Sequence, residues 1–130
     1  MSPLDCQVFK TIMKDGTTEQ FPIYEVLEQI SVGFIERLHI LTALDISTPN
    51  QIAISINNLT RLGLFISPET QGLIDESLYK EIEKSSHFKL IQDELKLLHI
   101  PNDKIKYVKK FLSVTNFAHS FYEICVKDIN

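Results

Sequence analysis

The sequence predicts a single α+β domain over residues 1–130, with a winged-helix-like core of three helices and a small antiparallel sheet. The first observation is the stretch TPNQIAISINNLTRLGLFI, residues 48–66, in which a helix start, an amphipathic helix, a glycine and an apolar strand follow one another. In winged-helix proteins the recognition helix leads into the wing in this order. The second is KIKYVKKFLSV, residues 104–114, a strand-like segment that follows a helical insertion at about 67–103.

A first helix is expected from Pro3 to about Asp15. Ser2 is a suitable N-cap, Pro3 suits the first helical position, and Asp5 completes a capping box. Gly16 would end the helix. Its apolar stripe comprises Leu4, Val8, Phe9, Ile12 and Met13. Residues 21–28 are expected to form a strand, because β-branched and aromatic residues dominate there and the proline lies at the start.

Residues 34–44 are expected to form the second helix of the core. The spacing of Phe34, Leu38 and Leu41 favours this, although IERLHIL also fits the alternation of a strand. The third helix begins with the capping pattern of Thr48 and Pro49 and ends at Gly63, which can adopt a left-handed conformation. Its apolar face comprises Ile52, Ile56, Leu59 and Leu62. Its polar face comprises Asn50, Gln51, Asn57, Asn58 and Arg61, with Ile54 in the middle.

The insertion at about 67–103 has its own helical periodicity. Two helices are expected, separated near Ser85 and Ser86, with apolar positions at Ile74, Leu78, Ile82, Phe88, Ile91, Leu95 and Leu98. Residues 101–103 form a turn before the last strand. Thr115 or Asn116 would cap a final helix with a buried stripe of Phe117, Phe121, Ile124 and Cys125.

Charge limits the classes of partner. The net charge is −4, which disfavours nucleic acid, since affinity for nucleic acid comes largely from basic side chains. Lys104, Lys106, Lys109 and Lys110 nevertheless gather in the last strand, where an anionic partner would approach. Equally, lysines protect an edge strand from pairing with another molecule.

The sequence favours a non-catalytic protein. His39, His87, His99 and His119 fall in no metal-ligand spacing, and Cys6 and Cys125 are interpreted as small apolar residues in a reducing cytoplasm, with a disulfide as the alternative. Carboxylate pairs such as Asp75-Glu76 and Asp93-Glu94 suit a solvated helix face. The glycines at Gly16, Gly33, Gly63 and Gly72 form no phosphate loop, so no cofactor is expected. The apolar runs are too short to span a bilayer, and the N-terminus lacks a signal-peptide pattern.

Three blocks resemble the abortive infection alpha (Abi-alpha) family of bacterial proteins: SPLDCQVFKTIMKDGTTEQFPIYEV, INNLTRLGLF and FLSVTNFAHSFYEICV. The last resembles the family's Leu-Thr-x-x-Gly-x-x-Phe-x-x-x-Cys pattern through Val114, Thr115, Phe121 and Cys125, with Ala118 in place of the glycine. Family members are often longer, so the resemblance implies that this chain corresponds to a C-terminal, winged-helix-like part. It also implies a role in antiphage defence.

The sequence therefore predicts an interaction module that binds another protein or itself, with no enzymatic activity, metal or cofactor. The expected contact residues are Gln51, Ile54, Asn57, Asn58 and Arg61 on the helix and Lys106, Lys109 and Lys110 on the wing. Two alternatives remain. A DNA-binding winged-helix transcriptional regulator could read base edges with the same helix face. A hydrolytic enzyme would need a cleft that holds His119 beside Cys125 and a carboxylate.

Overall fold

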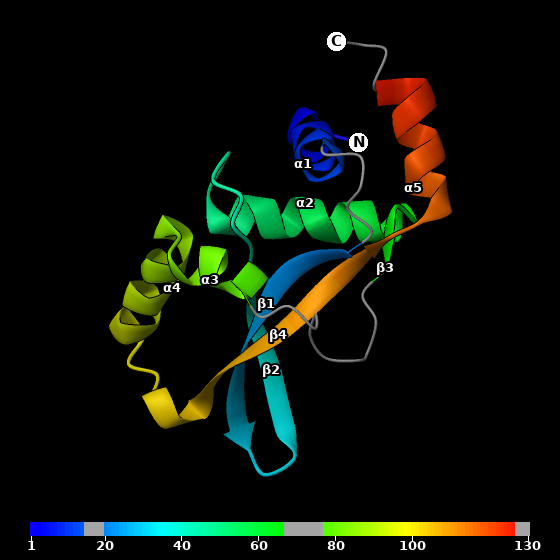
Figure 1. Ribbon diagram of the computed structural model, residues 1–130. Coiled ribbons are helices and arrows are strands. Elements are labelled where there is room, and N and C mark those ends of the chain that lie inside the picture. The colour runs from blue at the N-terminus through cyan, green and yellow to red at the C-terminus, as the bar shows by residue number, and fades with distance from the viewer. Residues whose placement is uncertain (15–19, 67–76, 127–130) are drawn as a thin grey trace.

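A curled antiparallel sheet forms the centre of the molecule (Figure 1). The computed structural model describes residues 1–14, 20–66 and 77–126. The strands are β1 (Gln20–Ser31), β2 (Phe34–Leu41), β3 (Phe65–Ile66) and β4 (Ile105–Val114), in the spatial order β2-β1-β4-β3. The helices are α1 (Pro3–Met13), α2 (Pro49–Arg61), α3 (Ser77–Glu83), α4 (Ser86–Leu97), the 3₁₀ turn Asn102–Lys104, α5 (Asn116–Phe121) and a π-helical turn Tyr122–Val126.

The segment 34–44 is a correction to the sequence-based expectation, because residues 34–41 form strand β2 instead of a helix. β2 makes a hairpin with β1, and the register shifts between Val26 and Leu27, where Val26 pairs with His39 and Leu27 with Arg37. Such a bulge places an extra residue, Leu38, in one strand and interrupts the alternation of side chains. The apolar spacing of this strand therefore imitates a helical period.

The remaining elements lie largely where the sequence predicts them. Ser2 and Asp5 form the expected capping box of α1, and Thr48, Ser85 and Thr115 cap α2, α4 and α5. Gly63 has φ +82°, and β3 follows it and pairs antiparallel with the end of β4. Gly16, Gly72 and Ile74 lie outside the described residues. The α+β class is confirmed, but the winged-helix assignment is not, since β2 stands where the second core helix was expected.

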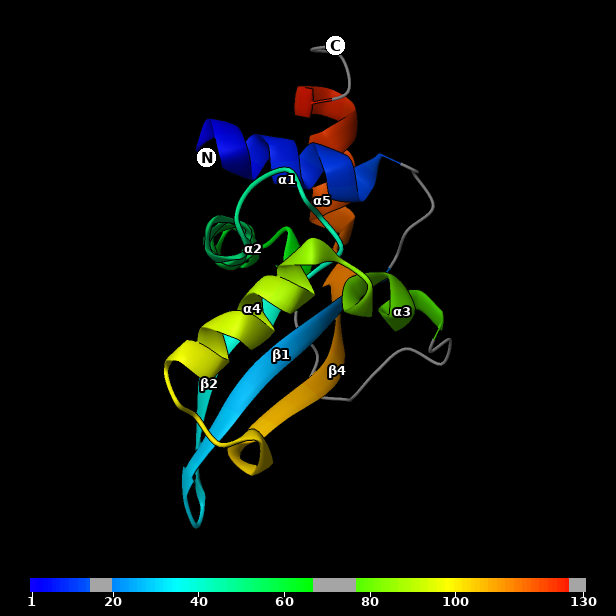
Figure 2. The same ribbon diagram turned by 90° about the vertical axis from the view of Figure 1, so that its left-hand side faces the viewer.

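Two hydrophobic clusters hold the helices to the sheet. One joins α1, α2, α5 and β3 around Phe9, Leu59 and Phe65, which are at most 1% exposed. The other lies where α3 and α4 cover β1, β2 and β4 around Tyr24 and Tyr79 (Figure 2). Their rings lie 5.5 Å apart, and the Tyr79 hydroxyl donates to the Lys110 carbonyl at 2.8 Å. The inserted helices are therefore an integral part of the core.

Four residues that the sequence places in the core are exposed in the structure, and three of them lie at or beyond the end of an α-helix. Leu62, Leu98, Phe117 and Ile124 were expected to be buried, but each is between 50% and 73% exposed. Each of Leu62 and Leu98 follows the last residue of its helix, and Ile124 lies in the π-helical turn, where the 3.6-residue period no longer applies. In α5 the fully buried residue is Ala118, which permits close packing against the core. The side chain of Cys125 lies outside the described part of the chain.

Candidate functional site

The predicted contact residues of α2 divide into two groups. Asn58 and Arg61 are bonded within the protein: Arg61 Nη2 donates to Asn58 Oδ1 at 2.6 Å, and Asn58 Nδ2 donates to Asp5 Oδ2 at 3.4 Å. Gln51 and Ile54 are exposed, Ile54 at 47%. Asn57 is partly buried and lines a hollow with Ile54. The helix face thus divides into two parts. Arg61 and Asn58 continue to Asp5 through hydrogen bonds within the protein, which we call the internal polar chain, and Gln51, Ile54 and Asn57 form a separate surface.

Asp5 is the anchor of the internal polar chain. Its side chain accepts a hydrogen bond from the Ser2 backbone N–H at 3.2 Å as well as the bond from Asn58, and the residue is 4% exposed. Burial acts to raise the pKa of Asp5. Hydrogen bonds from Ser55, Ser2 and Asn58 outweigh it and hold the pKa below the ordinary aspartate value. The carboxylate therefore joins α1 to α2 in its charged form.

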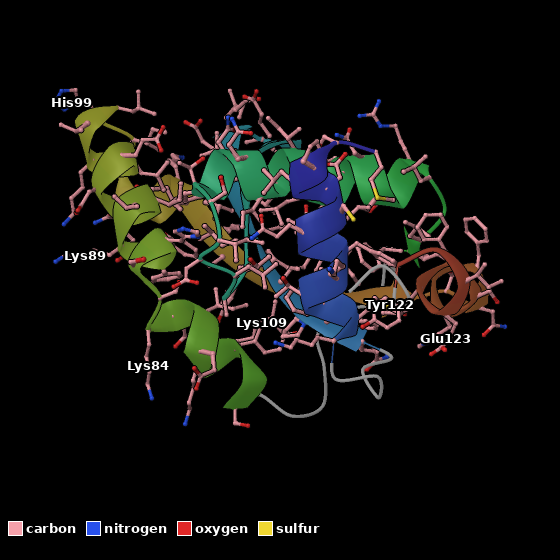
Figure 3. All side chains as sticks on the ribbon, turned by 90° about the horizontal axis from the view of Figure 1, so that it is seen from above. Lys84, Lys89, His99, Lys109, Tyr122 and Glu123 are labelled. Atoms are coloured by element: carbon pink, nitrogen blue, oxygen red, sulfur yellow. The ribbon has the colours of Figure 1, made fainter. Side chains whose placement is uncertain are left out.

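The three wing lysines do not form one surface. Lys109 and Lys110 are neighbours on β4, so their side chains leave opposite faces of the sheet. The ammonium of Lys110 lies 2.5 Å from Glu25 Oε1, and that of Lys109 lies 5.7 Å from the centre of the Tyr79 ring, beside α3 (Figure 3). Lys106 is exposed. The sheet register brings two of the lysines into contacts within the protein.

A groove on the described surface lies between α2 and α4, with residues of β2 in its lining. We call it the α2–α4 groove; it measures about 680 Å³ and continues into a hollow of about 220 Å³ along α2. Its lining combines aliphatic, polar and acidic side chains. The lining residues of the two parts are Leu38, His39, Ile40, Thr48, Pro49, Asn50, Ala53, Ile54, Asn57, Leu90, Ile91, Asp93, Glu94 and Leu97.

The α2–α4 groove presents exposed leucines beside carboxylates. Leu90 is 55% exposed and Leu97 79%, and the two lie on the same side of α4 at a seven-residue spacing. Asp93 and Glu94 lie between them in sequence and are exposed. An aliphatic surface of this kind, rimmed by charge, is typical of a site that binds another macromolecule. Sequence reasoning found only its α2 side, through Asn57 and Ile54.

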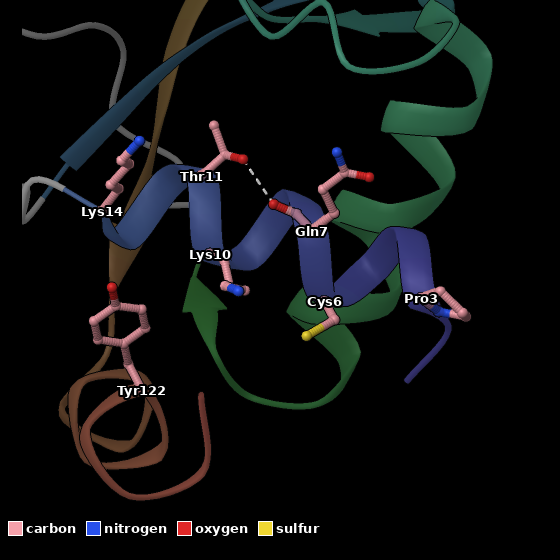
Figure 4. Close-up of a pocket in the computed structure, with 7 residues that line it drawn as sticks. All are labelled: Pro3, Cys6, Gln7, Lys10, Thr11, Lys14 and Tyr122. Carbon is pink, nitrogen blue, oxygen red and sulfur yellow. Dashed lines mark hydrogen bonds between the residues drawn. The ribbon is translucent and has the colours of Figure 1, made fainter. Parts of the chain in front are cut away.

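A second pocket, of about 550 Å³, lies where Tyr122 approaches the outer side of α1 (Figure 4). Lys10, Lys14 and Cys6 line it. Thr11, also in the lining, donates its hydroxyl hydrogen to the Gln7 carbonyl at 2.7 Å. Apart from Tyr122, the lining side chains come from neighbouring turns at α1, and among the described residues the lining includes no carboxylate or histidine.

The described part of the chain contains no group of three His, Cys, Asp or Glu side chains placed to hold a metal ion. Of the pair that the hydrolytic alternative requires, His119 lies in α5 and the side chain of Cys125 lies outside the described residues. Among the described helices, none combines the length and the apolar character needed to cross a bilayer.

Comparison with solved structures gives a similar fold. The structure of an uncharacterized protein from the hydrocarbon-degrading marine bacterium Alcanivorax borkumensis SK2 superimposes with a TM-score of 0.56 and 22% sequence identity, over 95% of this chain and 84% of that one. At this identity the likeness concerns the fold alone. No curated protein matches the chain.

The sequence as a whole matches the abortive infection alpha family over residues 1–125. The match covers the three blocks that carried the resemblance except for Val126 at the end of the last one, and it extends over nearly the whole chain. It does not confirm the expectation of a C-terminal winged-helix part. The chain belongs to the abortive infection alpha family.

Proposed function

We propose that the protein is a non-catalytic interaction module of bacterial antiphage defence and that the α2–α4 groove is its docking surface for a protein partner. The family supplies the abortive-infection context. The observation that carries the docking surface is the pair of exposed leucines, Leu90 and Leu97, on α4 above a recess. Complete burial of a fully exposed leucine gains about 1.5–3 kcal/mol, so covering Leu97, which is 79% exposed, would gain most of this and covering Leu90, at 55%, about half.

The charge of the α2–α4 groove favours a protein partner with basic side chains. Asp93 and Glu94 are exposed at its rim, and the lining includes no lysine or arginine among the described residues. A segment with aliphatic side chains flanked by basic ones would satisfy both parts of the surface. Duplex DNA would be repelled from the same rim, because each carboxylate faces a polyanion.

The contacts that Arg61 and Lys110 make within the protein also favour a protein partner over duplex DNA. Arg61 is held by Asn58, and Lys110 by Glu25. Binding a phosphate backbone would require these contacts to be exchanged for new ones. If the protein is nonetheless a DNA-binding regulator, it will retard duplex DNA at low ionic strength with a steep salt dependence. The double variant Lys109→Glu with Lys110→Glu will then abolish the retardation.

The function can be tested by phage plating. Cells that express the wild-type chain are expected to reduce the plating of at least one phage in a panel, and the variant Leu90→Asp with Leu97→Asp is expected to lose this protection. Both side chains are exposed, so the fold should survive, which circular dichroism will verify. Ile124→Asp, at a 73% exposed position on another element, is the matched control and should protect like the wild type.

Two outcomes would contradict the proposal. Full protection by a folded Leu90→Asp, Leu97→Asp variant would remove the groove from the function. Failure of the wild-type chain to restrict any phage in the panel would remove the defence role.

A further inference from the structure

The sheet ends at β2 on one side, and the α2–α4 groove borders this edge strand. Within the described part of the chain β2 has one strand neighbour, β1, because the spatial order is β2-β1-β4-β3. Leu38 and His39 of β2 line the groove, and Ile40 lines the hollow that continues from it. An edge strand presents a row of backbone N–H and C=O groups that can pair with a further strand.

The two walls of the groove belong to opposite faces of the sheet. Ile40 of β2 lies in the hydrophobic cluster that includes α2, whereas the next residue, Leu41, lies in the cluster that includes α4. Ile23 and Tyr24 of β1 divide between the same two clusters. Since neighbouring residues of a strand point to opposite faces, α2 covers one face and α4 the other. A groove bounded by both helices and by β2 therefore lies where the next strand of the sheet would be.

Both walls carry exposed aliphatic side chains beside this position. Ile54 of α2 is 47% exposed, and Leu90 and Leu97 of α4 are 55% and 79% exposed. A strand directs alternate side chains to opposite faces, so it would cover Ile54 with one set and the two leucines with the other. A helix would present a single apolar stripe and would leave the backbone edge of β2 without hydrogen bonds. The two walls therefore fit an extended segment better than a helical one.

The features that hinder strand pairing lie in the first half of β2. Glu36 and Arg37 carry opposite charges, and the bulge at Leu38 follows them. Charged residues and bulges of this kind protect an edge strand. His39 and Ile40, which follow the bulge, are in the lining of the groove and its hollow. The second half of β2 is therefore the part where a strand can be added.

The charges of α4 favour a basic residue in such a segment. Asp93 and Glu94 line the groove, and the lining includes no lysine or arginine among the described residues. Lys96 of α4 lines a separate hollow together with Gln92. Lys89 lies two helical turns before Lys96 and thus on the same side of α4. The groove side of α4 is acidic and its other side basic, so a lysine or arginine in the segment would meet a carboxylate.

We infer that the α2–α4 groove binds an extended segment of its partner, which pairs with the second half of β2 as an added strand. The segment carries aliphatic side chains toward both walls and a basic residue toward Asp93 or Glu94. This inference rests on the proposed function of the groove and specifies the conformation of the partner there. Backbone hydrogen bonds to β2 supply affinity, and the two walls select the side chains.

Selection of peptides provides the probe. A library of short random peptides displayed on yeast is sorted for binding to the purified wild-type chain, and the enriched peptides are then measured against variants. They are expected to combine aliphatic residues with lysine or arginine. Binding should weaken about tenfold in Leu97→Asp and about threefold in Ile54→Asp, where less surface is covered. Ile124→Asp, exposed on another element, should bind like the wild type, and circular dichroism verifies that each variant is folded.

Two modifications of an enriched peptide distinguish a strand from a helix. N-methylation of alternate residues, one set at a time, removes the N–H groups from one edge of an extended peptide. One set should weaken binding about tenfold and the other should have little effect, because only one edge faces β2. Photoreactive side chains at consecutive positions should crosslink alternately to α2 and to α4.

The outcomes separate this inference from the proposed function. Peptides that bind equally with either set of N-methyl groups, or that crosslink to only one of the two helices, would overturn the added strand. So would the absence of any peptide whose binding depends on Leu97 and Ile54. In each case the proposed function still stands if Leu90→Asp with Leu97→Asp loses protection against phage. An added strand as expected, together with unchanged protection by that variant, would contradict the proposed function alone.

Discussion

Replacing Asp5 with alanine tests how α1 is held to α2. The carboxylate accepts hydrogen bonds from Ser2 N–H and Asn58 Nδ2 and is 4% exposed. Losing a capping interaction costs about 1 kcal/mol. Leaving the buried donor of Ser55 and the partly buried donor of Asn58 without their charged acceptor costs about 1–3 kcal/mol more. The expected loss in the free energy of unfolding is therefore about 2–4 kcal/mol.

The assay is urea unfolding followed by circular dichroism at neutral pH. Asp45→Ala is the matched control, because Asp45 is exposed and lies between β2 and α2, outside any helix or strand; it should change the free energy of unfolding by less than about 0.5 kcal/mol. Equal stability of Asp5→Ala and the wild type, within about 0.5 kcal/mol, would refute the assignment of Asp5 as the anchor between the two helices.

The pH dependence follows from the lowered pKa of Asp5. The carboxylate contributes stability above its unfolded pKa of about 3.9, and this contribution is lost as the pH falls through the lower folded pKa. The difference in unfolding free energy between the wild type and Asp5→Asn should thus be constant near neutrality and shrink below about pH 4. A difference that grows on acidification would contradict the sign of the shift.

Three further substitutions test contacts where helices meet the strands of the sheet. Gly63→Ala should cost about 1 kcal/mol in unfolding free energy, because φ is +82° there, while Ala53→Gly in the regular part of α2 provides a comparison of backbone effects. Thr115→Val should cost about 1–2 kcal/mol, since its hydroxyl accepts from Ala118 N–H at 3.0 Å and donates toward the carbonyl of Gly63 at 2.9 Å. Tyr79→Phe should cost about 1 kcal/mol, as the bond to the Lys110 carbonyl is lost. Denaturant unfolding measures each, and an unchanged midpoint in any of them would contradict its stated contact.

Local signals in the sequence located most elements, because capping residues act within a few positions. Ser2, Thr48, Ser85 and Thr115 mark helix starts that the structure contains. The left-handed Gly63 likewise follows from its position after an amphipathic helix. By contrast, the strand β2 depends on pairing with β1, and its bulge disturbs the alternation that would have identified it.

The candidate site was only partly predictable for the same reason. Ile54 and Asn57 line the α2–α4 groove as part of the helix face that the sequence indicates, but α4 supplies the opposite wall from a distant segment. A signal was available in α4. Leu90 and Leu97 fall outside its buried stripe of Ile91 and Leu95, and apolar residues on a second side of a short helix indicate a second contact surface. The internal use of Asn58 by Asp5 has no local signal, because the two lie 53 positions apart.

The most direct measurement of the docking surface is site-specific photocrosslinking from position 97. A photoreactive residue at Leu97, which is 79% exposed on the groove, is placed in the full chain, with Ile124 as the matched position elsewhere. The account predicts a discrete protein adduct from position 97 and none from position 124. Absence of any adduct from position 97, both in the purified protein and in phage-infected cells, or equal adducts from both positions, would contradict the assignment of the α2–α4 groove as the docking surface.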